Sequence, residues 1–237
     1  MQRLIPICGL LLGAAGAAHA HDIITTAVTF NRQISRVLIE RCASCHIPGG
    51  TAFSLLTYGE TRPWAIAIKE EILRRRMPPW GAVKGFGEFR NDQGLTSEEL
   101  ELLLSWIDGG VPEGEEKDLP PPPKLAPTPA TRTPAGALTV TGDDYKLTRR
   151  FKLDGLMPGT VPPNASLKIV AELPDASVEP LLWLDGYRKE FPHAFLLRKA
   201  LDLPAGTLIR GVPQGTSITL LPVMASAAPK ATATPRP

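Results

Sequence analysis

Two cysteines three positions apart, followed at once by a histidine, constrain this chain more than any other feature. They are Cys42, Cys45 and His46, in the stretch Arg41-Cys-Ala-Ser-Cys-His46. This spacing is typical of a covalent c-type haem attachment site. On a helix, positions i and i+3 share a face, so both thiols can reach the vinyl groups along one porphyrin edge and become thioethers. His46 can then ligate the iron from the proximal side.

Two other interpretations of the cysteine pair are weaker. A zinc site needs about four ligands, and the only other cysteine is Cys8, in an N-terminal segment that we expect to be removed. A thioredoxin-like dithiol opens a helix after a strand, whereas this pair follows a helical pattern that begins near Asn31. We therefore expect one covalent haem c per chain.

Apolar residues at helical spacing predict three helices in the first half of the chain. The first runs from Asn31, its N-cap, into the cysteine motif, and the second runs from Pro63 to the arginines 74–76. The third begins with a capping box formed by Thr96 and Glu99. The three arginines are interpreted as a solvated helix end that complements the helix dipole. The alternative is that they pair with haem propionates or with a docking partner.

Met77 follows the second predicted helix, in the sequence Met77-Pro-Pro-Trp80. A thioether is the usual sixth ligand of an electron-transfer haem, and two prolines give a stiff extended loop. The alternative is a core methionine that fills a gap. Other candidate ligands lie in the second half of the chain or at its start: His21, Met157, His193 and Met224. We therefore predict that His46 and Met77 are the two axial ligands of the iron.

Residues 28–114, which carry these motifs, resemble class I c-type cytochromes, many of which have a Met-Pro-Pro loop after the second helix. The resemblance implies an all-α haem domain whose last helix crosses the first, with Phe30 and Trp106 near the crossing. Trp106 lies off the apolar stripe, so a partly exposed aromatic is the alternative. A proline carbonyl is also implied as the partner of the proximal histidine, and Pro48 is the candidate. An apolar segment either lines the haem pocket or belongs to the ordinary core: Phe53, Leu55, Leu56 and Tyr58.

After residue 136 the apolar period changes from 3.6 to 2. Short alternating segments bounded by turns predict a small antiparallel β-sandwich; they are Leu138–Val140, Tyr145–Leu147, Phe151–Leu153, Leu167–Ala171, Leu182–Leu184, Phe195–Leu197 and Leu208–Arg210. The expected fold class is multidomain, an all-α cytochrome c domain (21–114) followed by this β-sandwich domain (137–224). A proline-rich spacer (115–136) joins the two, and a disordered tail (225–237) follows.

Residues 167–223 are similar to the C-terminal half of copper type II monooxygenases. Those enzymes hold copper with two histidines and a methionine. His193 is the only histidine after residue 46, and one histidine cannot meet the ligand count of a transition metal. We therefore expect this copper site to be absent. A weaker alternative uses His21 as an N-terminal metal ligand, although no second histidine lies near it after cleavage.

The first twenty residues have the pattern of an export signal. Arg3 precedes an apolar run, and Ala18-His-Ala20 is a small-x-small cleavage site. The run is too short to span a bilayer comfortably, although an uncleaved anchor is the alternative. We expect a mature chain that begins at His21, lies in the periplasm and has no transmembrane span. The c-type resemblance also implies haem attachment outside the cytoplasmic membrane.

A formal charge of +2 over 237 residues does not favour nucleic acid or a strongly basic membrane surface. The leading hypothesis is an electron carrier rather than an enzyme. With both axial positions filled there is no open site for a small-molecule substrate. The β domain would be a docking module, and the redox partner proteins are not identified by the sequence. The alternative is a haem-containing subunit or domain of an oxidoreductase that feeds a metal centre in a partner or in the β domain.

Overall fold

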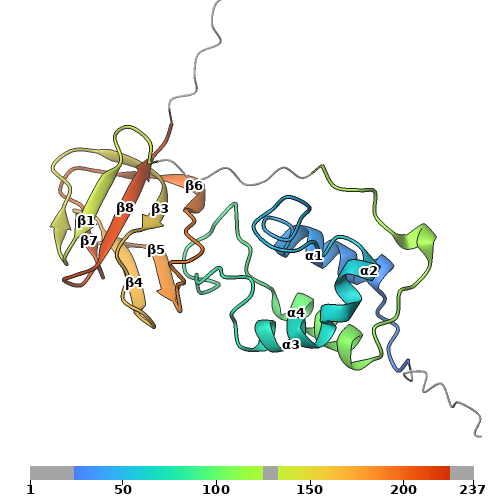
Figure 1. Ribbon diagram of the computed structural model, residues 1–237. Helices are drawn as coiled ribbons and strands as arrows, with labels where there is room; N and C mark the ends of the chain where they lie inside the picture. The colour runs from blue at the N-terminus through green and yellow to red at the C-terminus, as the bar shows by residue number, and fades with distance from the viewer. Residues whose placement is uncertain (1–23, 125–132, 225–237) are drawn as a thin grey trace, which may run out of the picture.

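The computed structural model describes residues 24–124 and 133–224 (Figure 1). Within that part of the chain, 22% of the residues are helical and 25% are in strands. The expected fold class, with an all-α cytochrome c domain, is therefore wrong: the fold is mainly β, with short helices. The predicted signal segment (1–20), the tail (225–237) and residues 125–132 of the predicted spacer lie outside the described residues.

The helices lie in the first half of the chain and are shorter than their sequence pattern predicts. The first ends before the cysteine motif instead of running into it. Its N-cap is Thr29 rather than Asn31, whose buried side chain donates to the Gly114 carbonyl at 3.3 Å. In chain order the helices are η1 Phe30–Ile34, α1 Ser35–Arg41, α2 Tyr58–Thr61, η2 Arg62–Trp64, α3 Ala65–Leu73, α4 Ser97–Asp108 and η3 Glu116–Asp118. No helix among the described residues is long and apolar enough to cross a membrane.

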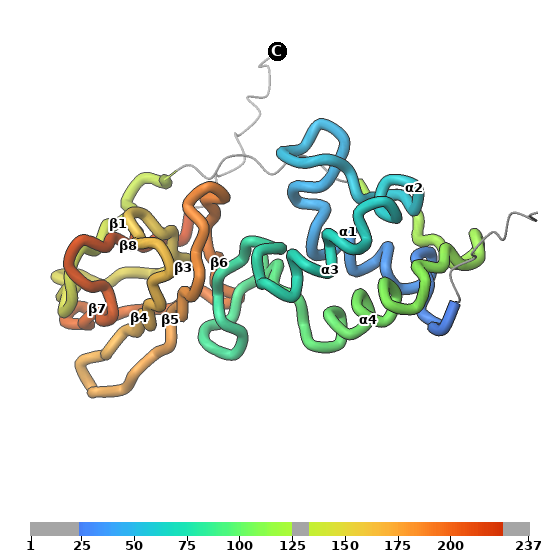
Figure 2. Tube along the Cα trace, turned by 60° about the horizontal axis from the view of Figure 1, so that its bottom comes forward, coloured from blue at the N-terminus to red at the C-terminus, as the bar shows by residue number. Residues whose placement is uncertain are grey.

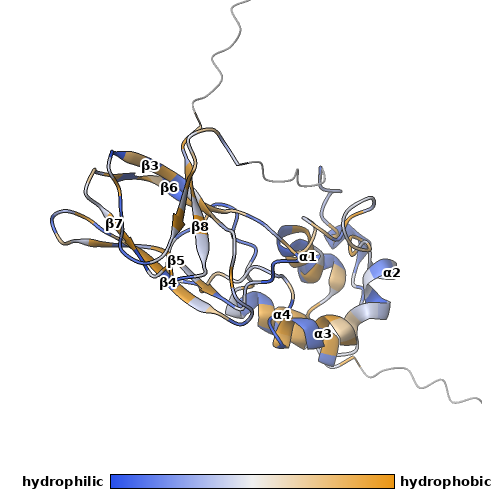
Figure 3. Cartoon of the chain, turned by 60° about the vertical axis from the view of Figure 1, so that its left-hand side comes forward, coloured by the Kyte–Doolittle hydropathy of each residue, from blue (hydrophilic) through white to orange (hydrophobic). Residues whose placement is uncertain are grey.

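The best-defined helix, α4, begins as predicted. Thr96 accepts from the Glu99 amide and Glu99 accepts from the Thr96 amide, which confirms the capping box. The helix carries both apolar and polar residues (Figure 3), and it packs on η1 and α3. Trp106 is fully buried, with its ring 6.1 Å from that of Phe30. Its indole N–H donates to the Pro112 carbonyl at 3.0 Å, so the partly exposed alternative is wrong.

The second half of the chain forms two four-stranded antiparallel sheets, an arrangement consistent with the predicted β-sandwich. The strand orders are β1-β8-β3-β6 and β2-β7-β4-β5. Each predicted strand segment overlaps an observed strand, and the pattern missed β8. The strands are β1 Leu138–Thr141, β2 Tyr145–Lys146, β3 Phe151–Pro158, β4 Ser166–Glu172, β5 Val178–Asp185, β6 Phe195–Leu203, β7 Leu208–Arg210 and β8 Ser217–Pro222. We call residues 138–222 the two-sheet unit.

A stretch between α3 and α4, residues 80–91, completes the two-sheet unit, and we call it the bridging segment. It runs along the outer edges of β5 and β6, the last strands of their sheets (Figure 2). The Val83 amide donates to the Trp183 carbonyl at 2.9 Å, and the Arg90 amide donates to the Leu196 carbonyl at 2.9 Å. The bridging segment therefore pairs with one edge strand of each sheet, which satisfies backbone groups that an edge would leave open.

Side chains of the bridging segment enter the core between the sheets. Trp80 and Phe89 are 3% and 6% exposed and belong to the same apolar cluster as the buried strand residues. Gly87 permits the close approach, because its φ is +78° and a Cβ there would lie 2.6 Å from the Leu181 carbonyl oxygen. The all-α expectation is wrong for this physical reason: residues between the helices lack a helical period and bond to β-strands.

Candidate functional site

The four residues predicted to bind haem line one cavity. Cys42, Cys45, His46 and Met77 surround a cavity of about 170 Å³. The rest of the wall is largely apolar. It comes from α1, α3, α4 and the loop before α2, and it includes Leu38, Leu55, Ile68, Ile72 and Leu103. Residues more than thirty positions apart in the sequence thus meet around one largely apolar cavity.

The cysteine motif lies in turns directly after α1, not on the helix itself. The Cys42 carbonyl accepts from the amides of Cys45 and His46, at 3.1 and 3.0 Å. This tight turn, rather than a helix face, directs both thiols to the cavity. Neither cysteine is in a disulfide. Burial, and next the neighbouring Cys45, raise the pKa of the Cys42 thiol to about 12, so this thiol is neutral at physiological pH.

His46 is held in one orientation by a backbone carbonyl. Its Nδ1 lies 2.9 Å from the Phe53 oxygen. Because a carbonyl can only accept, Nδ1 carries the proton and Nε2 keeps a free lone pair. Metal-bound histidines are commonly oriented in this way. The observed partner is therefore Phe53, and the expectation that the Pro48 carbonyl fills this role is wrong.

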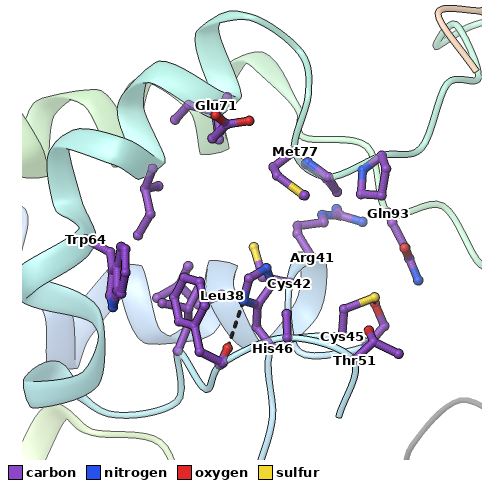
Figure 4. A pocket seen from close by; sticks show the side chains of 18 of the residues that line it. Leu38, Arg41, Cys42, Cys45, His46, Thr51, Trp64, Glu71, Met77 and Gln93 are labelled. Carbon is purple, nitrogen blue, oxygen red and sulfur yellow. Dashed lines mark hydrogen bonds between the residues drawn. The ribbon is translucent and has the colours of Figure 1, made fainter. Parts of the chain in front are cut away.

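Met77 enters the cavity from the side opposite His46 (Figure 4). Its position follows from the end of α3, where the amides of Arg76 and Met77 both approach the Glu71 carbonyl, at 2.9 and 3.3 Å. The thioether and the imidazole face each other across the space, and both thiols lie at its wall. This donor set, with two thiols, one free imidazole nitrogen and one thioether, fits a covalently attached haem with two protein axial ligands.

The predicted pocket-lining segment is divided between the cavity and the core. Phe53 and Leu55 line the cavity, and the Phe53 ring meets the His46 ring at 5.0 Å. Tyr58 instead packs against Phe30, with its hydroxyl donating to the Val111 carbonyl at 3.0 Å. The structure also adds Trp64 to the cavity wall, stacked on Phe53 at 4.5 Å. The sequence signal for Trp64 was its place on the second predicted helix.

The arginines after α3 do not line the cavity. Arg74 and Arg75 are exposed, as expected for a solvated helix end. Arg76 forms an ion pair with Glu71, with its Nε 2.8 Å from a carboxylate oxygen. Glu71 lies at the cavity wall beside Met77. That hydrogen bond holds the pKa of Glu71 below its ordinary value, so a carboxylate stands near Met77 at neutral pH.

Arg41 ties the cysteine motif to α4. Its Nε lies 2.9 and 3.1 Å from the two carboxylate oxygens of Glu99, and its Nη1 donates to the Asp92 carbonyl at 2.7 Å. Both side chains of the ion pair are largely buried, at 13% and 15% exposure. Burial alone would raise the pKa of Glu99, but hydrogen bonds from Arg41 and Thr96 hold it below its ordinary value. The residue before Cys42 is thus fixed by the same carboxylate that caps α4.

Glu99→Gln tests this anchor, because glutamine can keep the capping box but removes the charge. We expect the free energy of unfolding of the purified protein to fall by about 2 kcal/mol at pH 7. A lowered folded-state pKa stabilises the fold above the unfolded value of about 4.3, and this stabilisation is lost as pH falls through the folded pKa. Urea denaturation between pH 7 and pH 3 should therefore show a smaller acid loss in the variant. An equal loss of unfolding free energy between pH 7 and pH 3 in the two proteins would contradict the role given to the Glu99 carboxylate.

His193, the only histidine considered for copper, lies between two carbonyls. Its Nε2 is 3.1 Å from the Trp80 oxygen and its Nδ1 is 2.8 Å from the Phe191 oxygen. Burial lowers its pKa below the ordinary value, so the ring is neutral at physiological pH. Within residues 24–124 and 133–224, no group of three or more histidine, cysteine, aspartate or glutamate side chains is placed to hold a metal ion. The sequence contained no signal for these contacts of His193.

The comparisons with known proteins add no relative: no protein-family model, curated protein or solved structure matches this chain.

Proposed function

We propose that this chain is an electron-transfer protein that carries one haem c, attached covalently through Cys42 and Cys45 and ligated by His46 and Met77. The observation that supports the proposal most directly is that all four side chains line one apolar cavity, with His46 and Met77 facing each other across it. The resemblance of the cysteine and methionine motifs to those of c-type cytochromes supports the same proposal. When bound, the haem would supply a one-electron redox centre.

The residues of the chain have separate tasks in this proposal. The Phe53 carbonyl fixes the ring of His46 and leaves Nε2 available to the iron. Met77 supplies a thioether, which raises the reduction potential relative to a second imidazole. The apolar wall excludes water and lowers the local dielectric, which tunes the potential further. With two protein ligands, substrate has no open position at the iron.

The cellular setting of this function is also proposed. The chain would be exported by its N-terminal signal and would work in the periplasm, where it exchanges electrons with redox partner proteins. The two-sheet unit, as a β-sandwich, would serve as the docking or structural module of the carrier. No nucleic acid and no small-molecule substrate take part.

The test is a mass, a metal count and a visible spectrum of the purified mature protein. We expect a mass increase of one haem that survives denaturation, one iron and no copper. The oxidised form should show a sulfur-to-iron charge-transfer band, and the ferrous form should bind carbon monoxide only weakly, because Met77 competes for the iron. Cys42→Ala with Cys45→Ala should yield a protein that loses haem on denaturation. Copper in the metal count, or ready carbon monoxide binding, would instead support the oxidoreductase alternative.

A further inference from the structure

The loop between β5 and β6, residues 186–194, contacts the chain on both sides of Met77. The Arg188 guanidinium donates to the Arg76 carbonyl at 3.2 Å, one residue before Met77. The His193 ring lies 3.1 Å from the Trp80 carbonyl, three residues after Met77. We call this stretch the β5–β6 loop. The side chains of Arg188 and His193 therefore contact the two ends of residues 76–80, the short segment that carries the Met77 thioether.

The ring of His193 is fixed by packing as well as by hydrogen bonding. It stacks on the Trp80 ring, with centroids 5.1 Å apart and an interplanar angle of 16°, and meets Phe195 at 4.7 Å. Tyr187 is the titratable side chain that faces it, with centroids 5.9 Å apart. A neutral imidazole donates one hydrogen, so His193 bonds either the Trp80 or the Phe191 carbonyl at any moment. The stacking on Trp80 keeps the ring beside the Trp80 carbonyl in either case.

The tip of the β5–β6 loop also reaches the cavity. Phe191 is part of the cavity wall, together with Met77, Pro78 and Pro79. The Arg188 guanidinium lies over the Phe191 ring, 4.8 Å from its centroid. The β5–β6 loop belongs to the two-sheet unit. It nevertheless forms part of the cavity wall and makes two contacts with residues 76–80.

We propose that the β5–β6 loop holds Met77 in place as the sixth ligand, with His193 and Arg188 as the positioning residues. The two-sheet unit then has a role in haem ligation in addition to any docking role. This inference rests on the proposed function, because it concerns a haem ligand. Neither His193 nor Arg188 touches the iron; each acts through a carbonyl of the run that carries Met77.

The expected size of the effect follows from the hydrogen bonds. A methionine-bound iron is in equilibrium with a form in which the sulfur has moved away. Each hydrogen bond that favours the bound form shifts this equilibrium by roughly fivefold, the equivalent of one typical net hydrogen bond. Loss of either positioning residue should thus raise the sulfur-free population by about that factor, and loss of both by roughly twenty-fivefold where the contacts are independent.

The experiment uses the full-length holoprotein and two readouts, the sulfur-to-iron charge-transfer band and the binding of carbon monoxide to the ferrous form. His193→Ala and Arg188→Met should each raise the apparent carbon monoxide affinity about fivefold and weaken the band. His193→Gln, which keeps a side-chain donor, should restore much of the wild-type behaviour. Val140→Ala is the control, because Val140 is fully buried in β1 and makes no contact with the β5–β6 loop that the structure records.

Each outcome decides between the proposals. A wild-type protein without covalent haem, or without the band, contradicts the proposed function and this inference with it. Wild-type haem and band with unchanged carbon monoxide binding in His193→Ala and Arg188→Met overturn the inference alone. An equal rise in Val140→Ala also overturns it, since the effect would then come from general loosening. If His193→Ala does not fold, the comparison of His193→Gln with Arg188→Met decides. A positioning role predicts near-wild-type carbon monoxide affinity in His193→Gln and a raised affinity in Arg188→Met, and equal affinities would overturn the inference.

Discussion

Replacing Met77 with alanine is expected to abolish the sulfur-to-iron charge-transfer band of the oxidised holoprotein and to open the ferrous iron to carbon monoxide. Among the described residues, Met77 is the one methionine that lines the cavity. Because a thioether ligand raises the potential, its loss should lower the reduction potential by on the order of 0.1 V or more, within the roughly 0.8 V that axial ligands span. Visible spectroscopy and a redox titration measure both effects.

Met157→Ala is the matched control, since it makes the same chemical change in β3, away from the cavity. We expect it to leave the band, the potential and carbon monoxide binding at their wild-type values. A Met77→Ala protein that keeps the band would show that another residue is the sixth ligand. Equal losses in both variants would mean that the band reports overall stability rather than ligation by Met77.

The residues of the candidate site could be predicted because they occur in short sequence motifs. Two thiols and a histidine at fixed spacing, and a methionine before two prolines, are both recognisable without a fold. The structure brings Cys42, Cys45, His46 and Met77 to one cavity, while their roles toward haem stay predictions. The start of α4 could be predicted for the same reason, because its capping box depends only on the four residues from Thr96 to Glu99.

What could not be predicted depends on contacts between distant parts of the chain. The partner of His46 is the Phe53 carbonyl rather than that of Pro48, and any residue type could supply that oxygen. The bridging segment contains several glycines and no helical period, a pattern that is typical of a loop. Its pairing with β5 and β6 is a property of the exposed strand edges, which no local pattern encodes. The wrong all-α expectation came from treating this stretch as part of a helical domain.

Phe89→Ala is expected to lower the free energy of unfolding of the two-sheet unit by about 3–5 kcal/mol, the usual cost of removing a fully packed aromatic side chain. Phe89 precedes the first strand by almost fifty residues, yet it lies in the core between the sheets. Its ring meets those of Trp80 and Phe195 at 5.9 and 5.6 Å. Urea denaturation followed by circular dichroism in the strand region measures the loss.

Phe86→Ala is the matched control from the same segment. Phe86 is only half-buried and rests on Trp183, with ring centroids 6.0 Å apart, so its loss should cost about 1 kcal/mol. Similar losses in the two variants would contradict the placement of Phe89 in the core. A large loss confined to Phe89→Ala would mean that the strands depend on residues from the first half of the chain. Residues 137–224 expressed alone should then unfold at lower urea concentration than the same strands in the full chain.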